Sequence, residues 1–317
     1  MKKVNILFLG GAKRVSLAEH LIAAGKRFGL DVSVFSYELD KKVPLASVGT
    51  ILTGKMWSDA DLFSDLHQQI NKNNISIVLP FVDPAIEVAE LLKEGNKDLF
   101  IPTCGKDICH IMFDKVLSER WFTEKGLPIP PSFSQYDQIQ FPAIVKPRKG
   151  SASKGIIVID NAEQWDKLEN KDNYVIQQYI ADREEYTVDC YVTTTGKIIS
   201  IVPRIRLQVA GGEVMNSETR KDEELIKISE KVLQSGNFKG PVTIQYLRDK
   251  KSGATYLMEI NPRLGGGVIT SIEAGADITE FILRDFLGEE LQPFDNWEDK
   301  MLMTRYFKEV IFHANNH

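Results

Sequence analysis

The stretch YLMEINPRLGGG, residues 256–267, places a carboxylate, an amide and a guanidinium at every second position. Successive side chains of a β-strand point to opposite faces of a sheet, so Glu259, Asn261 and Arg263 would share one face. The positions between them are mostly apolar, and polar groups at the end of an apolar strand need a partner. The pattern therefore predicts a polar site on one face of a sheet, with three glycines beyond it.

Composition limits the classes of protein to consider. The chain has 317 residues and a formal net charge of −5, which gives no indication of a nucleic-acid or anionic-membrane partner. Its one early apolar run, Val4–Leu9, is far too short to span a bilayer. The three cysteines are too few for a disulfide framework and favour a reducing, cytoplasmic location. Cys104, Cys109 and His110 match no common zinc spacing.

The first third of the chain alternates strand-like and helix-like segments. Strands are predicted at 4–9, 32–35 and 75–79, and helices at 15–28, 59–72 and 84–94. This alternation predicts a parallel sheet covered on both faces, in an α/β domain over residues 1–105.

The remaining two thirds read as an α+β region of short strands. A helix is expected at 107–124 and another at 221–235. Predicted strands cover 141–145, 156–159, 174–178, 185–193, 197–207, 241–247 and 254–260. Their glycine- and aspartate-rich turns indicate antiparallel pairing. We expect a small lobe over 106–180 and a larger lobe over 181–317.

Two glycine motifs are weaker than they look. Gly10-Gly11 follows the first strand, but GGAKRV lacks the G-x-G-x-x-G spacing of a dinucleotide fold, and a tight strand-to-helix turn explains it better. The segment GTILTGKM, residues 49–56, nearly spells a phosphate-binding P-loop. Met56, however, replaces the hydroxyl that would contact magnesium.

Two segments have the composition of a nucleotide site. In FPAIVKPRKGSASKGIIVI, residues 141–159, a glycine–serine loop follows a strand that ends near Lys146, and Lys154 lies within that loop. Exposed backbone N–H groups there could surround an anion, although a flexible hairpin with solvated lysines fits equally well. In YVIQQYIADREEYTVDCYV, residues 174–192, Gln178 and Glu185 flank a connector that could hold a base and a ribose. An ordinary surface hairpin remains the alternative.

Gln245 completes a set of oxygen donors with Glu259 and Asn261. It lies on the strand that would form a hairpin with 254–260, across the turn Lys250–Gly253. Hard oxygen donors suit Mg²⁺ or Mn²⁺, whose coordination substrate phosphates usually complete. A polar, solvent-facing strand pair is the alternative.

Taken together, these motifs resemble the ATP-grasp superfamily, and most closely one synthetase repeat of the carbamoyl-phosphate synthetase large subunit. The resemblance covers Phe113 to Glu290. It rests on the order and spacing of FDKVLSERWFTEKGLPIPPS (113–132), PAIVKP (142–147), GSASKG (150–155), IQQYI and EEYTVD (176–189), MEINPRLGGG (258–267) and EAGADI (273–278).

The resemblance implies a fold and a set of roles. An N-terminal Rossmann-like, pre-ATP-grasp domain would precede a two-lobed ATP-grasp fold. The implied ATP-binding residues are Lys115, Lys146, Ser151, Ser153, Gly155, Gln178, Tyr179, Ile180 and Glu185. The implied metal ligands are Gln245, Glu259 and Asn261, and the implied catalytic cations are Arg263, Lys154 and Arg206. Gln178 would accept from the adenine amino group, and Glu185 would bind the ribose.

The implied activity is that of an ATP-dependent carboxylate–amine ligase acting through an acyl phosphate. Its partners would be a small-molecule carboxylate and an amine, in the cytoplasm, and a homodimer is compatible. Gln178 and Gln245 replace acids found in many members, and the chain holds a single repeat without a glutamine-hydrolysing Cys–His pair. A kinase forming an acyl or carbamoyl phosphate, and a non-catalytic ATP-binding protein, remain alternatives. A nicotinamide oxidoreductase would rest on Gly10-Gly11 alone.

The acceptor site is the least defined part. Arg14, Glu38 and Asp83 fall at predicted strand ends, where ligands meet open α/β sheets. Each could equally be a capping or ion-paired residue. We also expect a loop from Gly211 to Thr219 near the acceptor.

Overall fold

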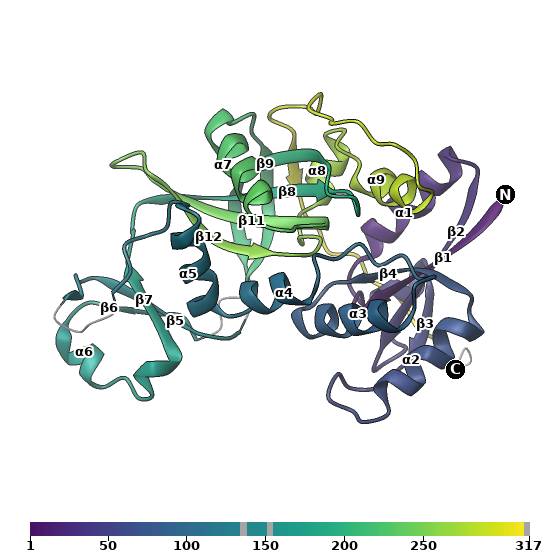
Figure 1. Cartoon of the computed structure of the whole chain (residues 1–317), viewed down its shortest axis with the longest axis horizontal. Helices are drawn as coiled ribbons and strands as arrows, with labels where there is room; N and C mark the ends of the chain where they lie inside the picture. The colour runs from purple at the N-terminus through teal and green to yellow at the C-terminus, as the bar shows by residue number, and fades with distance from the viewer. Residues whose placement is uncertain (134–137, 151–154, 314–317) are drawn as a thin grey trace.

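The structure is a computed structural model that describes residues 1–133, 138–150 and 155–313 (Figure 1). It contains a four-stranded, a six-stranded and a three-stranded sheet. Among the described residues, no helix is both long and apolar enough to cross a bilayer.

The four-stranded sheet lies in the first domain, and all of its strands are parallel. Its order is β3 (Thr50–Thr53), β2 (Leu30–Glu38), β1 (Lys2–Leu9) and β4 (Ile75–Pro80). The second half of the central strand β1 is an unbroken apolar run, Ile6–Leu9, because helices cover both faces. α1 (Val15–Arg27) and α9 (Ile278–Phe286) pack on one face, and α2 (Leu62–Lys72) and α3 (Asp83–Gly95) on the other. The predicted parallel α/β domain is confirmed.

The six-stranded sheet is antiparallel and forms the centre of the molecule (Figure 1). Its strands, in spatial order, are β12 (Thr255–Asn261), β11 (Gly240–Asp249), β8 (Arg183–Val192), β9 (Ile198–Ala210), β10 (Glu213–Thr219) and β13 (Leu302–Thr304). Its apolar face packs on α4 (Lys106–Met112), α5 (Lys115–Glu124) and α7 (Glu223–Ser235). The opposite face is polar near β11 and β12 and contributes to the site described below.

The three-stranded sheet forms a small, separate layer. Its order is β6 (Ile157–Ile159), β5 (Ala143–Pro147) and β7 (Tyr174–Gln178), again antiparallel. It packs against the short helix α6 (Ala162–Asp166) through a core of four buried residues, Ala143, Val145, Ile159 and Trp165. The remaining elements are short: η1 (Pro44–Ser47), η3 (Lys171–Asn173) and α8 (Ile269–Glu273).

The structure corrects two local predictions and agrees with the rejection of the P-loop-like segment. The helix expected at 107–124 is two helices, because Asp114 is the N-cap of α5 and accepts hydrogen bonds from the backbone N–H groups of Val116 and Leu117. The loop expected from Gly211 to Thr219 is a tight glycine turn followed by strand β10. The P-loop-like segment 49–56 contains strand β3, so its backbone does not curl around a phosphate.

Candidate active site

The predicted metal ligands lie on the polar face of the six-stranded sheet. Glu259 of β12 pairs directly with Gln245 of β11, and Gln245 pairs with Thr187 of β8. Directly opposed residues of antiparallel strands point to the same face, so the carboxylate and the amide are neighbours. Ile260 and Ile244, one position along each strand, belong to the buried apolar face. The register therefore separates an oxygen-rich face from an apolar one.

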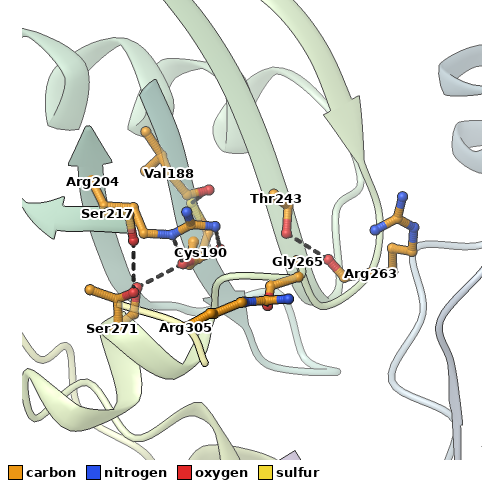
Figure 2. Close-up of polar contacts among 12 residues, drawn as sticks. Val188, Cys190, Arg204, Ser217, Thr243, Arg263, Gly265, Ser271 and Arg305 are labelled. Carbon is orange, nitrogen blue, oxygen red and sulfur yellow. Dashed lines mark hydrogen bonds and ion pairs between the residues drawn. The ribbon is translucent and has the colours of Figure 1, made fainter. Parts of the chain in front are cut away.

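Arg263 links this face to the first domain. Its Nη2 atom donates to Oδ1 of Asn261 at 3.3 Å, and its Nε atom lies 3.4 Å from Oδ1 of Asp83. Figure 2 shows the Thr243 hydroxyl donating to the Arg263 carbonyl, at 2.8 Å. These contacts fix the backbone where β12 passes into the glycine stretch. A predicted catalytic cation and a predicted acceptor residue, Asp83, thus meet from segments 180 residues apart.

Arg206 of β9 adds a second cation beside the metal ligands. Its Nη1 atom lies 3.5 Å from Oε1 of Gln245. Burial lowers the pKa of Arg206, although the carboxylates of Glu185 and Glu259 act in the opposite direction. Its Nε atom is buried and has no hydrogen-bond partner in the described part of the chain. The guanidinium therefore has an unused donor next to the place where a phosphate would lie.

A cavity of about 510 Å³ separates the three-stranded from the six-stranded sheet, and we call it the inter-sheet cavity. The connector between the two lobes forms one wall of it. Its lining includes Lys115, Ile144, Lys146, Ile156, Val158, Gln177, Gln178, Tyr179, Ile180, Arg183, Glu185, Arg206, Val209, Gly212, Gln245, Leu247, Met258 and Glu259. Apolar side chains suited to a base thus share one cavity with cations and carboxylates suited to a metal-bound triphosphate.

The two predicted phosphate lysines both line the inter-sheet cavity. Lys146 is 8 % exposed, and its Nζ atom donates to Oε1 of Gln177 at 2.8 Å. Burial lowers the pKa of Lys146 to about 8, against the nearby carboxylate of Glu259. Lys115 donates to the carbonyl of Gly150 at 3.0 Å, at the start of the glycine–serine loop. Both ammonium groups therefore lie where they could meet phosphate oxygens.

The connector residues Gln178, Tyr179 and Ile180 also line this cavity, as does Glu185. Arg183 holds the connector in place: its Nη1 atom donates to the Ile180 carbonyl at 2.9 Å, and its Nε atom lies 3.1 Å from Oε1 of Glu185. Ser151, Ser153 and Lys154 lie outside the described residues. Gly155, which follows them, is exposed and has a φ of 73°.

Two further cavities continue from this region. The glycine-loop cavity, of about 320 Å³, is lined by the predicted ligands Gln245, Glu259 and Asn261 and by Arg14, Arg204, Arg206, Arg263 and Gly265–Gly267. The first-domain cavity, of about 510 Å³, lies beside it and shares five lining residues with it: Arg14, Phe81, Val82, Glu213 and Gly266. Because neighbouring cavities share lining residues, the three cavities lie side by side between the lobes and the first domain.

The three residues that were predicted to bind the acceptor, Arg14, Glu38 and Asp83, do not share one cavity. Arg14 lines both the glycine-loop and the first-domain cavity, and Asp83 pairs with Arg263. Glu38 lines neither of these two cavities. Its carboxylate instead accepts a hydrogen bond of 2.6 Å from the Ser36 hydroxyl, within the first domain. Burial raises the pKa of Glu38, while hydrogen bonds from Ser36 and the backbone of the β1–α1 turn oppose the shift.

The donor set fits magnesium better than a softer metal. It consists of one carboxylate and two amides, all with oxygen donors, on adjacent strands. The described residues contain no cluster of three or more His, Cys, Asp or Glu side chains that could hold a metal ion on its own. Phosphate oxygens would have to complete the coordination, as Mg²⁺ commonly requires.

A buried network of polar side chains packs against the glycine stretch Gly265–Gly267. Arg204 donates from Nε to Asp189 at 2.8 Å, and the Ser271 hydroxyl donates to the same carboxylate at 2.7 Å (Figure 2). The Nη1 atom of Arg204 is buried without a hydrogen-bond partner in the described structure. A Cβ atom on Gly267 would lie 2.6 Å from that Nη1, which is too close for any side chain. Glycine is therefore required there by close packing.

Four residues of the site escaped the sequence predictions: Gln177, Arg204, Glu213 and Arg305. Gln177, rather than its neighbour Gln178, contacts Lys146. Strand alternation from the buried Val175 could have indicated Gln177, since both side chains point to the same face. No local signal marks Arg305, which pairs with Glu213 at 2.7 Å from a segment 92 residues away.

Comparisons with known proteins agree with this geometry. Residues 170–308 match the family described as "ATP-grasp in the biosynthetic pathway with Ter operon", and residues 104–182 match the tubulin-tyrosine ligase family. The D-alanine–D-alanine ligase of Fusobacterium nucleatum is 26 % identical over 252 residues, which cover 71 % of this chain and 85 % of that one. The soybean methylcrotonoyl-CoA carboxylase subunit alpha is 22 % identical over 67 % of this chain, and the match spans only 33 % of its own length.

The fold has solved counterparts as well. The biotin carboxylase of Campylobacter jejuni, in a beta-gamma-ATP complex, superimposes with a TM-score of 0.74, at 17 % identity, over 93 % of this chain and 73 % of that one. The fold is a two-lobed ATP-grasp architecture preceded by a Rossmann-like domain. In sequence, the chain is similar to an ATP-grasp family over residues 170–308 and to D-alanine–D-alanine ligases.

Proposed function

We propose that this protein is an ATP-dependent carboxylate–amine ligase that activates a small carboxylate as an acyl phosphate and releases ADP and phosphate. One observation carries the proposal: Lys146 and Glu259 line the same cavity, from sheets that face each other across it. The two sides can bind a triphosphate together. A continuous route then leads past Arg263 toward the first domain, where an acceptor would bind.

The chemistry follows from charge. A carboxylate that attacks the γ-phosphate must approach a polyanion, and catalysis depends on cations that neutralise both partners. Lys115 and Lys146 would hold the α- and β-phosphates, and Arg263 and Arg206 would face the transferred phosphoryl group. Removing one such group typically lowers the rate about 10²–10³-fold.

Glu259, Asn261 and Gln245 would hold one or two Mg²⁺ ions, which neutralise phosphate charge when bound. An amine then displaces phosphate from the acyl carbon, so a covalent enzyme intermediate is not required. Gln178, Tyr179 and Ile180 would bind the adenine, and Glu185 the ribose. The serines and Lys154 of the 150–155 loop would close over the phosphates.

The proposal includes the cellular location and the partners of the protein. The described cysteines are all free and buried, which supports a reducing, cytoplasmic location. Small molecules are the proposed partners, and a homodimer is compatible with the proposal.

The central test is ADP formation from ATP and magnesium in the presence of pools of small carboxylates and amines. We expect Glu259→Ala to lower the rate at least about 10²-fold. Glu230→Ala, at an exposed position on α7, serves as the matched control and should turn over normally. If Glu259→Ala formed ADP at the normal rate, the metal assignment would be wrong.

The same assay separates the alternatives. A ligase needs the amine for product formation, whereas a kinase would release an acyl phosphate that hydroxylamine traps without any amine. A non-catalytic binding protein would bind ATP but would form no ADP with any of the acceptors.

A further inference from the structure

The first-domain cavity has an unbalanced set of charges. Three cations line it, Lys13, Arg14 and Arg305, and Glu213 is the sole acid among its lining residues. That acid already pairs with Arg305, with Oε2 lying 2.7 Å from Nη1. A cavity lined in this way favours an anionic ligand.

Arg14 and Arg305 both approach Gly266, and Nη2 of Arg305 donates to the Gly266 carbonyl. A Cβ atom placed on Gly266 would lie 3.6 Å from Nη1 of Arg14 and 3.7 Å from Nη2 of Arg305. The space above Gly266 is therefore within reach of two guanidinium groups that come from the first domain and from the segment after β13. We call this space the arginine cradle, defined by Arg14, Gly266 and Arg305. Its size suits a carboxylate, which can accept from both groups.

Arg14 lacks the counter-ion that a guanidinium in this position needs. No carboxylate of the described residues forms an ion pair with it, and its Nη1 atom reaches the Gly265 carbonyl only at 3.4 Å. The guanidinium lies over the Phe81 ring, 5.3 Å from the centroid. Burial lowers the pKa of Arg14 to about 10, and the positive charges of Arg263 and Arg305 act in the same direction, while the Glu213 carboxylate opposes them. The negative charge of an anion bound in the cradle would offset the lowering.

The start of α1 adds a second attraction for an anion. This helix has 13 residues, no capping side chain and no acidic residue in its first turn. Ser16 and Leu17 of that first turn line the cavity. Unsatisfied N–H groups and the helix dipole favour negative charge at such a terminus.

The rest of the cavity lining is largely apolar. Leu17, Val268, Ile269 and Met303 contribute to it, together with Tyr306. A ligand held by its carboxylate in the cradle would therefore place an apolar body against these side chains, which gains free energy from burial.

We propose that the arginine cradle binds the carboxylate to be activated, and that the substrate is a monocarboxylate with an aliphatic or aromatic body. The cradle lies beside Gly265 and Arg263, so the bound carboxylate faces the glycine-loop cavity, where the γ-phosphate would lie. This inference rests on the proposed function and names the substrate class of that site.

Binding is tested first without ATP or magnesium, by saturation-transfer NMR titration. The probes are 4-methylpentanoate, its amine analogue 4-methylpentylamine, and the dicarboxylate pentanedioate. We expect 4-methylpentanoate to bind, the amine to show no saturable binding, and pentanedioate to bind more weakly because it has a second charge facing apolar side chains. Tighter binding of the amine or of the dicarboxylate would overturn the proposal.

Variants then locate the site. Arg14→Gln and Arg305→Gln should each weaken 4-methylpentanoate binding about tenfold or more, because a charge-assisted hydrogen bond is lost. Gly266→Ala should weaken it too, since its methyl group fits without a clash but fills the cradle. Arg120→Gln, at an exposed position on α5, is the matched control. Unchanged ATP affinity in all four variants excludes misfolding. Normal 4-methylpentanoate binding by Arg14→Gln and Arg305→Gln would disprove the cradle.

The two proposals fail in different ways. If the protein forms no ADP with any carboxylate and amine while the cradle variants lose 4-methylpentanoate, the proposed function is wrong and the binding site stands. If Glu259→Ala is inactive while the cradle variants bind 4-methylpentanoate normally, the reaction stands and the carboxylate binds elsewhere.

Discussion

Lys146 and Gln177 lie face to face, with a hydrogen bond of 2.8 Å from Nζ to Oε1 inside the inter-sheet cavity. The amide satisfies the ammonium group but gives it no opposing charge. Gln177 in turn donates from Nε2 to Glu119 at 3.1 Å. A buried lysine whose closest side-chain partner is neutral loses its proton more easily, and burial lowers its pKa to about 8.

ATP affinity should therefore fall as the pH rises through about 8, where Lys146 loses its charge in the free protein. Gln177→Glu supplies a carboxylate at hydrogen-bond distance, which raises the pKa of Lys146. The fall in affinity should then move to higher pH. Calorimetric titration of ATP between pH 6.5 and 9.5 measures the shift, and Gln178→Glu provides the comparison on the adjacent position. Identical pH profiles for Gln177→Glu and the wild type would contradict the assigned role of Lys146.

A substitution at Gln245 can test the metal ligands by strengthening magnesium binding rather than by weakening it. It pairs directly with Glu259, and its amide oxygen meets Arg206 only at 3.5 Å. Gln245→Glu adds a second carboxylate to the oxygen donors and should lower the magnesium concentration that gives half-maximal ADP formation. Because carboxylates attract divalent cations more strongly than amides do, a several-fold change is expected. An unchanged magnesium dependence would remove Gln245 from the ligand set.

The Asp189–Arg204 pair should matter mainly for stability. Both side chains are almost fully buried, at 1 % and 2 % exposure, and the carboxylate also accepts from Ser271. Asp189→Asn leaves a buried guanidinium without its charge partner, at a cost of about 3–5 kcal/mol in the free energy of unfolding. Ser271→Ala, which removes one neutral donor to a carboxylate, should cost about 1–3 kcal/mol. Urea unfolding of both variants tests this order, and a smaller loss for Asp189→Asn would refute it.

Asp114 joins helix α5 to the strand that contains Lys146. It caps α5 and pairs with Nε of Arg148 at 2.7 Å. Burial tends to raise the pKa of Asp114, but the hydrogen bond from Arg148 and the two N-cap bonds outweigh it and the pKa is lowered. The stabilisation is thus present above the unfolded pKa of roughly 3.9, and it is lost as the pH falls through the lower folded value.

Asp114→Ala should consequently cost about 0.5–2 kcal/mol in unfolding free energy at pH 7 and less at pH 3, which lies below the unfolded pKa of roughly 3.9. Urea unfolding at both pH values measures the difference. Equal losses at the two pH values would show that the carboxylate charge is not involved.

Strand periodicity predicted the polar face of the large sheet because it is a local property. Glu259 and Asn261 alternate with apolar neighbours, and the paired strand brings Gln245 opposite Glu259. The parallel first domain was predictable for the same reason. The break at Asp114 was missed because apolar residues continue on both sides of it, while its capping bonds depend on backbone geometry.

Contacts between distant segments could not be predicted in this way. Arg263 meets Asp83 because the end of β12 lies against the first domain, and Arg305 meets Glu213 because β13 pairs with β10. The contact of Gln177 with Lys146 depends on the pairing of β5 with β7, which sequence spacing alone does not fix. The roles of individual residues in ATP and metal binding remain predictions that the variants above can test.

The glycine turn between β9 and β10 touches two cavities at once. Gly212 lines both the inter-sheet and the glycine-loop cavity, and Gly211 and Gly212 have φ values of 57° and 80°. Fixing two glycines costs more conformational entropy than fixing any other residues. Binding of the first substrate would include the entropy cost of ordering the glycine turn. The second substrate would then bind to a turn that is already ordered. Each substrate is then expected to raise the affinity for the other by the same factor. This cooperative binding would limit the hydrolysis of ATP when no acceptor is present.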